Sequence, residues 1–450
     1  MGIYHFIAIG GIGMSGLAKY LLEDGHTVSG SDICDSKYIN ALRELGASVT
    51  VGHSSDNVPE GATVVVSTAI RENNPELIRA RELGLKIYHR SDMLKEIAEQ
   101  AQAGDNGVKK IFIGFSGTHG KTTTSGLCSY VLDKAGLKPS FVDGGIVPEL
   151  HTNAQHKSGK YFVAELDESD GTIVKYNSDI LVINNLEEDH LDFYKNGISD
   201  LVKTFNEAIS KSKKVIVNID NEGVKKLSGR FITYGLNTAD YTAKNIEYTK
   251  NGTTFDIYHG EEFLAPIKIQ LSGVHNVYNT LAVVSALTEA GVSVNNIKDY
   301  FYGFTGMGRR FQKVCELNGI EVYDDYAHHP TEIKATLNAA ALRFGKEHIV
   351  AVFQPHRYTR LKALWNEFKN SFTEAGRVVV TDVYSASEDK IEGITGENFA
   401  ADINAEYIKG NMKEVALALL PTLKKGDVVI GLGAGTITAL GKELESLELV

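Results

Sequence analysis

The sequence predicts an α/β protein of three domains. Short apolar runs alternate with helical stretches along the whole chain, from HFIAIG, ATVVVST and KIFIGF to HIVAVFQ, RVVVTDV and DVVIGLG. Buried parallel strands joined by crossover helices have this pattern. The 450 residues correspond to roughly three domains of about 150 residues each. An apolar content of 43% is enough to give each domain its own core.

Two stretches without apolar periodicity divide the chain. AEQAQAGDNGVKK (98–110) is polar and small, and FTGMGRRFQ (304–312) interrupts a helical stretch with Gly306 and Gly308. We therefore expect domains at 1–107, 108–312 and 313–450. The first and third are predicted to be Rossmann-like, doubly wound sheets. The central domain is predicted to hold a mixed sheet with an antiparallel extension from residues 233–271.

The composition limits the classes of partner. Lys and Arg total 46 against 57 Asp and Glu, a net charge of -11, which argues against non-specific binding to nucleic acid or an anionic membrane. The start of the chain has no basic region before its apolar run, and no apolar stretch approaches the length of a membrane span. Three widely separated cysteines, Cys34, Cys128 and Cys315, are typical of buried thiols in a reducing compartment. We expect a cytoplasmic protein, and its oligomeric state does not follow from the sequence.

The first loop, HFIAIGGIGMSGLA, matches the dinucleotide fingerprint G-x-G-x-x-G with Gly11, Gly13 and Gly16. Asp32 closes the next predicted strand, where an acid ordinarily binds a ribose hydroxyl of NAD. The pattern specifies only a diphosphate and a ribose, however, so it fits any nucleotide that offers both. The alternative is that these glycines only allow close packing of helix against strand.

The second loop, GFSGTHGKTTT (114–124), nearly matches the phosphate-binding loop G-x-x-x-x-G-K-[ST], but Phe115 stands where the first glycine is required. The loop follows the strand KIFIGF and leads into a helix predicted to begin at Lys121. Backbone amides at such a turn and helix start attract phosphate oxygens. Lys121 would add a positive charge and the Thr122 hydroxyl a magnesium ligand.

Two acidic loops follow apolar strands of the same domain, in KYFVAELDESDGT and DILVINNLEEDHLDFY. The carboxyl ends of parallel strands are where α/β sheets bind ligands. So many carboxylates repel one another unless a cation lies among them. The alternative is a solvated acidic surface. The acids concerned are Glu165, Asp167, Glu168, Asp170, Glu187, Glu188 and Asp189.

The third domain carries basic side chains in DDYAHHPTEI and FQPHRYTRL, after predicted strands. Arg357 and Arg360 are three residues apart, which suits one helical face directed at a carboxylate. His328, His329 and His356 have equally good interpretations as capping or packing residues.

The ordered strings GTHGKTTT, ELDESD, NNLEEDHLDFY, SGVHNVYNTLAV, GRRFQ, DDYAHHPTEI and FQPHRYTRL identify a resemblance to the Mur ligases of peptidoglycan synthesis. The resemblance extends over all 450 residues. In that family the ATP loop reads G-T-x-G-K-[ST]-T, so Phe115 is no defect. The resemblance implies ATP-driven ligation of L-alanine to UDP-N-acetylmuramate. It also implies that the first loop binds the UDP part of that sugar nucleotide instead of NAD.

The resemblance also implies a magnesium site with two ions. Thr122 would bind the first ion, and Glu165 would bind magnesium shared with a second site completed by His190. Some relatives carry a carbamylated lysine beyond this point. Phe205 lies near the corresponding position here, so no such lysine is assigned.

The remaining ATP contacts are carried over from matching strings. Asn276 and Asn279 would read the adenine, Arg310 would contact phosphate, and Asp325 would bind the ribose. The expected ATP-binding residues are Gly117, Thr118, Gly120, Lys121, Thr122, Thr123, Asn276, Asn279, Arg310 and Asp325. The expected UDP-sugar-binding residues are Gly11, Ile12, Gly13, Met14, Ser15, Asp32, Ser67, Thr68 and Arg90.

The implied reaction forms an amide through an acyl phosphate. The sugar carboxylate takes the γ-phosphoryl group of ATP and the amine of alanine then attacks, so catalysis consists of positioning and charge neutralisation. The expected catalytic residues are Lys121, Arg310, His328, Arg357 and Arg360. Two alternatives remain open at this point: a recycling ligase that joins a peptide to the same sugar nucleotide, and an NAD-dependent reductase or a nucleotide sensor without turnover.

Overall fold

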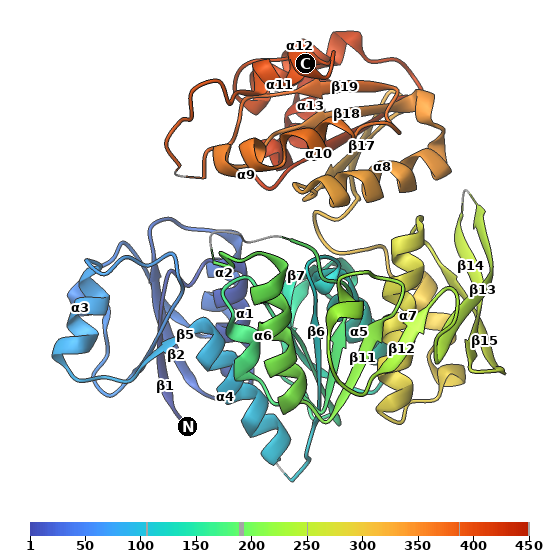
Figure 1. Cartoon of the computed structure of the whole chain (residues 1–450). Helices are drawn as coiled ribbons and strands as arrows, with labels where there is room; N and C mark the ends of the chain where they lie inside the picture. The colour runs from blue at the N-terminus through green and yellow to red at the C-terminus, as the bar shows by residue number, and fades with distance from the viewer. Residues whose placement is uncertain (105–106, 189–192, 250, 387, 449–450) are drawn as a thin grey trace. The chain divides into compact units, whose positions relative to one another are not determined.

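The computed structural model describes residues 1–104, 107–188, 193–249, 251–386 and 388–448. It contains three sheets of five, ten and six strands (Figure 1). The structure divides into two compact units, each considered by itself below. The first comprises Met1–Lys244, Asp256–Ile267 and Tyr278–Phe301, and the second comprises Asn245–Phe255, Lys268–Val277 and Tyr302–Val450. The predicted α/β class with three sheet-containing domains is confirmed. The boundaries at residues 107 and 312 stay predictions.

The first sheet is entirely parallel in its pairings and has the order β3-β2-β1-β4-β5, which is the Rossmann order 3-2-1-4-5-6 without its sixth strand. Its core lies on both faces, with Leu77 of α3 on one face and Leu17, Ile39 and Ile97 on the other. The strands are β1 (Ile3–Ile7), β2 (Thr27–Asp32), β3 (Ser48–Val51), β4 (Thr63–Val66) and β5 (Ile87–His89), and the helices are α1 (Ile12–Glu23), α2 (Lys37–Glu44), α3 (Pro75–Glu82) and α4 (Arg90–Ala103).

The second sheet has the order β15-β14-β13-β12-β11-β10-β6-β9-β7-β8. Strands β6 to β12 pair in parallel, apart from the antiparallel pair β7 and β8. The strands are β6 (Ile111–Ser116), β7 (Ser140–Val147), β8 (Thr152–Gln155), β9 (Tyr161–Glu165), β10 (Ile180–Ile183), β11 (Lys214–Asn218), β12 (Ile232–Gly235), β13 (Tyr241–Thr249), β14 (Gly252–His259) and β15 (Glu262–Ile269). The helices are α5 (Lys121–Lys134), α6 (Ile198–Lys211) and α7 (Val274–Glu289).

The predicted extension by residues 233–271 is present but only partly antiparallel. β13 joins β12 in parallel, through the pair Tyr234 and Tyr241. β14 and β15 are neighbours joined by two residues, a connection that only antiparallel strands allow. The alternating pattern of residues identified strands correctly but could not specify the direction of the first pairing.

The third sheet has the order β16-β17-β21-β18-β19-β20 and is parallel except for β16. Helices cover both faces, since Leu337 of α8 and Phe399 of α11 lie in one core cluster and Val415 of α12 and Leu444 of α13 lie in the other. The strands are β16 (Gln312–Leu317), β17 (Ile320–Asp325), β18 (Ile349–Phe353), β19 (Arg377–Val380), β20 (Glu406–Tyr407) and β21 (Val428–Leu432). The helices are α8 (Pro330–Phe344), α9 (Tyr358–Ala363), α10 (Trp365–Lys369), α11 (Gly396–Asp402), α12 (Met412–Leu419) and α13 (Leu440–Glu448).

The first and second sheets share one continuous apolar core within the first unit. It extends from Phe6 in β1 through Phe112 and Phe162 in β6 and β9 to Leu227. Polar contacts reinforce this packing, because Lys175 lies 2.5 Å from Asp92 of α4. The loops at the carboxyl ends of the two sheets therefore belong to one body. Across the described residues, no helix has both the length and the apolar character that a membrane crossing requires.

Candidate functional site

The glycine-rich turn of the first sheet lies between β1 and α1, as predicted. The Gly10 amide donates to Oδ2 of Asp32 at 2.9 Å, so the acid at the end of β2 lies directly beside the turn. Gly11 caps α1 without a side-chain bond, and the first-turn amides after it have no intrahelical acceptors. The structure thus brings the predicted diphosphate-binding turn and the predicted ribose-binding acid together. Gly11 is the residue before α1, and Ile12, Gly13, Met14 and Ser15 form the first turn of that helix.

Arg90 occupies the same edge of the first sheet. It begins α4 directly after β5, and its Nη1 atom lies 3.8 Å from the position that a Cβ on Gly13 would take. Its Nη2 atom donates to Oδ2 of Asp167 at 2.8 Å. Burial raises the pKa of Asp167, but the positive charges of Lys121 and Arg90 outweigh it and hold that pKa well below its usual range. Arg90 is therefore a fixed cation between the turn and the ELDESD loop.

Ser67 and Thr68 directly follow β4, which pairs with β1 in the centre of the sheet. Their backbone turns there, since the Ile70 amide donates to the Ser67 carbonyl. Thr68 is exposed and Ser67 is partly exposed. Both predicted residues therefore lie at the carboxyl edge that carries the glycine turn.

The second loop has the conformation of a phosphate-binding turn. Gly117 and Gly120 have φ values of 129° and 79°, which disfavour any other residue. A Cβ on Gly117 would also lie 2.9 Å from the backbone nitrogen of Asn185. Phe115 is fully buried inside β6, so the mismatch falls in the strand and outside the turn. The helix begins at Lys121, as predicted.

Lys121 is already bonded to protein atoms. Its Nζ atom lies 2.9 Å from Oε1 of Glu168 and 2.7 Å from the Gly117 carbonyl oxygen. Burial lowers the pKa of Lys121, but the carboxylates of Glu168 and Asp167 outweigh it and raise that pKa above its usual value. Burial also raises the pKa of Glu168, an effect that Lys121 opposes. Burial prevails for Glu168, whose pKa rises to about 7, whereas Lys121 stays protonated.

Glu165 ends β9 at the same edge and is held by a backbone donor. The Gly144 amide of β7 donates to its Oε2 atom at 3.0 Å. A Cβ on Gly144 would lie 2.1 Å from that oxygen, so only glycine admits the carboxylate in this position. Thr122 lies in the first turn of α5 and is partly exposed. His190, the third predicted metal ligand, lies outside the described residues.

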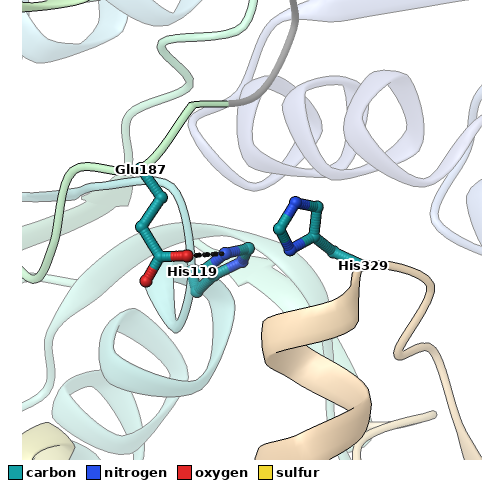
Figure 2. A group of neighbouring side chains, drawn as sticks. All are labelled: His119, Glu187 and His329. Atoms are coloured by element: carbon teal, nitrogen blue, oxygen red, sulfur yellow. Dashed lines mark ion pairs between the residues drawn. The ribbon is translucent and has the colours of Figure 1, made fainter. Parts of the chain in front are cut away.

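The segment after β10 is hydrogen-bonded to the phosphate-binding turn, and the sequence did not predict the role of Asn185 there. Asn185 accepts from the His119 amide at 2.7 Å and donates to the His119 carbonyl at 3.0 Å. The Glu187 amide donates to the Thr118 hydroxyl at 2.9 Å. The His119 ring lies 3.4 Å from the Glu187 carboxylate (Figure 2). Asn185 is the last residue of the predicted strand DILVINN and part of the string NNLEEDHLDFY, but neither place along the chain specified its bonds to His119.

The two predicted adenine readers lie in α7. Asn279 accepts from the Thr124 hydroxyl at 3.3 Å, and its Oδ1 atom lies 3.0 Å from the position of a Cβ on Gly120. It therefore touches the phosphate-binding turn. Asn276 lies in the second unit, where its amide donates to the Ser272 carbonyl at 2.8 Å.

Asp325 and Arg310 lie together in the second unit. Asp325 is buried and accepts from the amides of Phe311 and Ala327 at 2.8 and 2.7 Å. Burial raises the pKa of Asp325 to about 6. Arg310 lies 3.4 Å from Glu332 and faces the Tyr326 ring. Asp325 therefore holds the backbone that presents Arg310, and its expected role as a ribose ligand stays a prediction.

Three basic residues of the third domain also form a cluster. Nδ1 of His328 lies 2.9 Å from the Tyr326 carbonyl oxygen, and the rings of His328 and His356 are 5.8 Å apart. Arg360 donates to Nδ1 of His356 at 3.2 Å. Burial lowers the pKa of His328 to about 4 and that of His356 to about 3. Both rings are therefore neutral near pH 7.

The prediction that Arg357 and Arg360 share one face of a helix is wrong, because Arg357 lies outside the helix. Arg357 is the residue before α9, with φ at 68°, and only Arg360 lies in the helix. The Arg357 amide donates to the Tyr384 carbonyl, which fixes this unusual backbone. His329 is the capping residue of α8, which agrees with the interpretation of this histidine as a capping or packing residue.

Comparison with known proteins agrees with this geometry. Three family models match: the Mur ligase family, catalytic domain over residues 3–102, the Mur ligase middle domain over 115–287, and the Mur ligase, glutamate ligase domain over 309–435. The chain belongs to the Mur ligase family. The expected family is thereby confirmed, and its enzymes are ATP-dependent ligases.

Individual Mur ligases match over their whole length. The chain is 41% identical to a UDP-N-acetylmuramate–L-alanine ligase from Geotalea daltonii, covering 98% of this chain and 96% of that protein. Its sequence is 28% identical to that of UDP-N-acetylmuramate-alanine ligase from Thermotoga maritima. The crystal structure of that protein matches with a TM-score of 0.85, over 100% of this chain and 99% of the other. A murein peptide ligase from Psychrobacter arcticus shares the fold, at 22% identity, a TM-score of 0.72 and coverage of 100% and 99%.

Proposed function

We propose that this Mur ligase joins L-alanine to the lactoyl carboxylate of UDP-N-acetylmuramate, with ATP as the energy source, in the synthesis of peptidoglycan precursors. One structural relationship supports this assignment best. Asp167 and Glu168 are adjacent, and they bond to Arg90 beside the first nucleotide turn and to Lys121 in the second. Two anion-binding turns thus meet across one short loop, as a reaction between a nucleotide sugar and ATP requires.

The three domains divide the substrates in this proposal. Residues 1–107 bind the UDP-sugar, residues 108–312 bind ATP, and residues 313–450 supply Arg357, Arg360 and His328 to the alanine carboxylate and the substrate. A guanidinium binds a carboxylate through paired hydrogen bonds, which suits Arg360. Neutral His356 accepts from Arg360 and fixes the direction of its guanidinium. Dependence on ATP supports the cytoplasm as the place of action.

The residues of the ATP turn fit Mg²⁺. A carboxylate and a hydroxyl oxygen, from Glu165 and Thr122, are ligands that Mg²⁺ prefers. The absence of a side chain at Gly144 leaves the space that the Glu165 carboxylate occupies, which supports a fixed position for this ligand. Mg²⁺ bound there, with His190 completing a second position, would neutralise phosphate charge during transfer. We therefore propose ATP with Mg²⁺, in two positions, as the cofactors.

The chain's own groups then carry the reaction by positioning. Lys121 would leave Glu168 and bind a phosphate of ATP, and Arg310 would supply a second positive charge to the transferred phosphoryl group. The sugar carboxylate attacks the γ-phosphorus, ADP leaves, and the alanine amine attacks the resulting acyl phosphate to release phosphate. Charged donors aimed at the moving phosphoryl group stabilise the charge that spreads over it.

The test is phosphate release by purified protein. We expect release only when ATP, Mg²⁺, UDP-N-acetylmuramate and L-alanine are all present. Release that ignores the sugar nucleotide would refute the proposal. Replacing alanine by a tripeptide separates this activity from that of a peptide-recycling ligase, and the 41% identical relative favours alanine.

A further inference from the structure

Asn153 of β8 reaches from the second sheet into the glycine turn of the first. Its Nδ2 atom donates to the Ile12 carbonyl oxygen at 2.7 Å, and the side chain is only 4% exposed. Ile12 is the first residue of α1 and stands between Gly11 and Gly13 of the fingerprint. A residue of the ATP-binding domain thus bonds directly to the predicted diphosphate turn.

Gly16, the third glycine of the fingerprint, makes room for this contact. In a dinucleotide-binding domain that glycine allows the helix to pack closely on the strands of its own sheet. Here a Cβ on Gly16 would lie 2.7 Å from Nδ2 of Asn153, and 3.5 Å from the Cβ of Ala154. The nearest neighbours of this position therefore come from β8 of the second sheet.

The contact supplements a weak helix start, in which the Ile12 carbonyl also accepts from the Ser15 hydroxyl at 3.1 Å. Three glycines within six residues weaken helix formation from Gly11 to Gly16. The peptide bond is planar and trans, so a bond that fixes the Ile12 carbonyl also fixes the opposite direction of the Gly13 amide. That amide belongs to the first turn of α1, and backbone donors at a helix start form the kind of site that binds anions.

We propose that Asn153 is a positioning residue of the UDP-sugar site, which the ATP-binding domain thereby helps to form. This inference rests on the proposed function only for the identity of the nucleotide. Asn153 touches no reacting atom; it holds the Ile12–Gly13 peptide with its amide directed at the diphosphate.

Calorimetric binding of UDP to the full chain tests the proposal. We expect Asn153→Ala to weaken UDP binding by about five- to tenfold, which corresponds to the net contribution of one intramolecular hydrogen bond that holds the binding turn. Affinity for an ATP analogue should stay within about twofold, which is the scatter of such measurements on independent sites. Thermal unfolding of each variant reports whether the fold is intact.

Lys19→Ala is the matched control. Lys19 lies further along α1 and donates to the Thr152 hydroxyl at 2.7 Å and the Ala154 carbonyl at 2.8 Å. It ties the same helix to the same strand without touching the turn. We expect this variant to lower the unfolding temperature and to leave UDP affinity unchanged. Equal losses of UDP affinity in both variants would mean that general packing is responsible, and would overturn the proposal.

A double-mutant cycle provides an independent readout. Gly16→Ala should weaken UDP binding in the wild-type background because its methyl group displaces Asn153. In the Asn153→Ala background the same change should have less than about half of that effect in free energy, since contacting residues are energetically coupled. Equal effects in the two backgrounds would overturn the proposal. Failure of the wild-type protein to bind UDP would instead refute the nucleotide-sugar assignment itself.

Discussion

The Nζ atom of Lys121 lies 2.9 Å from Oε1 of Glu168, in a pair whose side chains are 12% and 1% exposed. The lysine of the proposed ATP turn is thus bonded to a protein carboxylate. Asp167, the residue before Glu168, bonds to Arg90 beside the UDP turn. One short loop therefore holds a cation beside each of the two glycine-rich turns.

Lys121→Ala should abolish turnover while UDP-N-acetylmuramate still binds. Among the described residues, the side chain bonds to Gly117, Thr118 and Glu168, whereas the proposed UDP turn belongs to the first sheet. Loss of a cation that stabilises the transferred phosphoryl group lowers the rate by at least about a hundredfold. Phosphate release measures turnover, and calorimetry measures sugar-nucleotide binding.

Lys203→Ala is the control for that variant, because Lys203 is exposed on α6. Its turnover should match that of the wild type. Loss of both nucleotide affinities in Lys121→Ala, with the fold intact, would contradict the separation of the two sites.

Gly144→Ala should raise the Mg²⁺ concentration that activity requires. The new methyl group would lie 2.1 Å from Oε2 of Glu165 and force that carboxylate out of its place. A displaced ligand typically weakens metal affinity by about tenfold or more. The measurement is activity against Mg²⁺ concentration, with UDP binding as an internal control. An unchanged Mg²⁺ dependence would argue against Glu165 as a ligand.

Arg360→Ala should raise the KM for alanine and leave the KM for UDP-N-acetylmuramate unchanged. A guanidinium that binds a carboxylate contributes about 1.5 to 3 kcal/mol, or roughly ten- to a hundredfold in affinity. Arg343→Ala is the matched control, since Arg343 of the same domain packs on the Phe344 ring. If both variants behaved alike, Arg360 would have no specific role toward alanine.

Glu76→Gln should change how stability depends on pH. Glu76 is fully buried; burial raises its pKa, but hydrogen bonds from His5, Ser31 and Asn57 outweigh it and lower the pKa from 4.5 to about 2. A carboxyl with a depressed folded pKa stabilises the fold above about pH 4.5 and loses this contribution as the pH falls toward about 2.

The wild type should therefore lose up to about 3 kcal/mol more of its unfolding free energy than the Glu76→Gln variant over this interval, since each pKa unit corresponds to about 1.4 kcal/mol. The variant lacks the titrating carboxyl, so that part of the acid loss should vanish, and it should be less stable than the wild type at pH 7. Urea unfolding at pH 7, 4.5 and 3 measures both effects. Parallel acid profiles of the two proteins would show that Glu76 is not the group concerned.

Local chemistry was sufficient to predict the two turns. Gly117 and Gly120 need positive φ values, and a helix begins at Lys121, because these requirements lie within a few consecutive residues. Arg357 was predicted on a helical face and lies before the helix instead, because the Tyr384 carbonyl, distant in sequence, fixes its backbone. Asp325 was expected to face a ligand, but the amides that it accepts from became visible only with the fold.

The sequence by itself determined the family, the α/β class and the order in which the motifs follow the predicted strands. It also determined which residues form each glycine-rich turn. These features could be predicted because apolar periodicity and short motifs are local. Only the tertiary structure decided which side chains share one site. Asn153 meets Ile12, Asp167 meets Arg90 and Gly144 meets Glu165 across 141, 77 and 21 residues. Such contacts depend on how strands pair and how sheets pack, and no spacing along the chain specifies them.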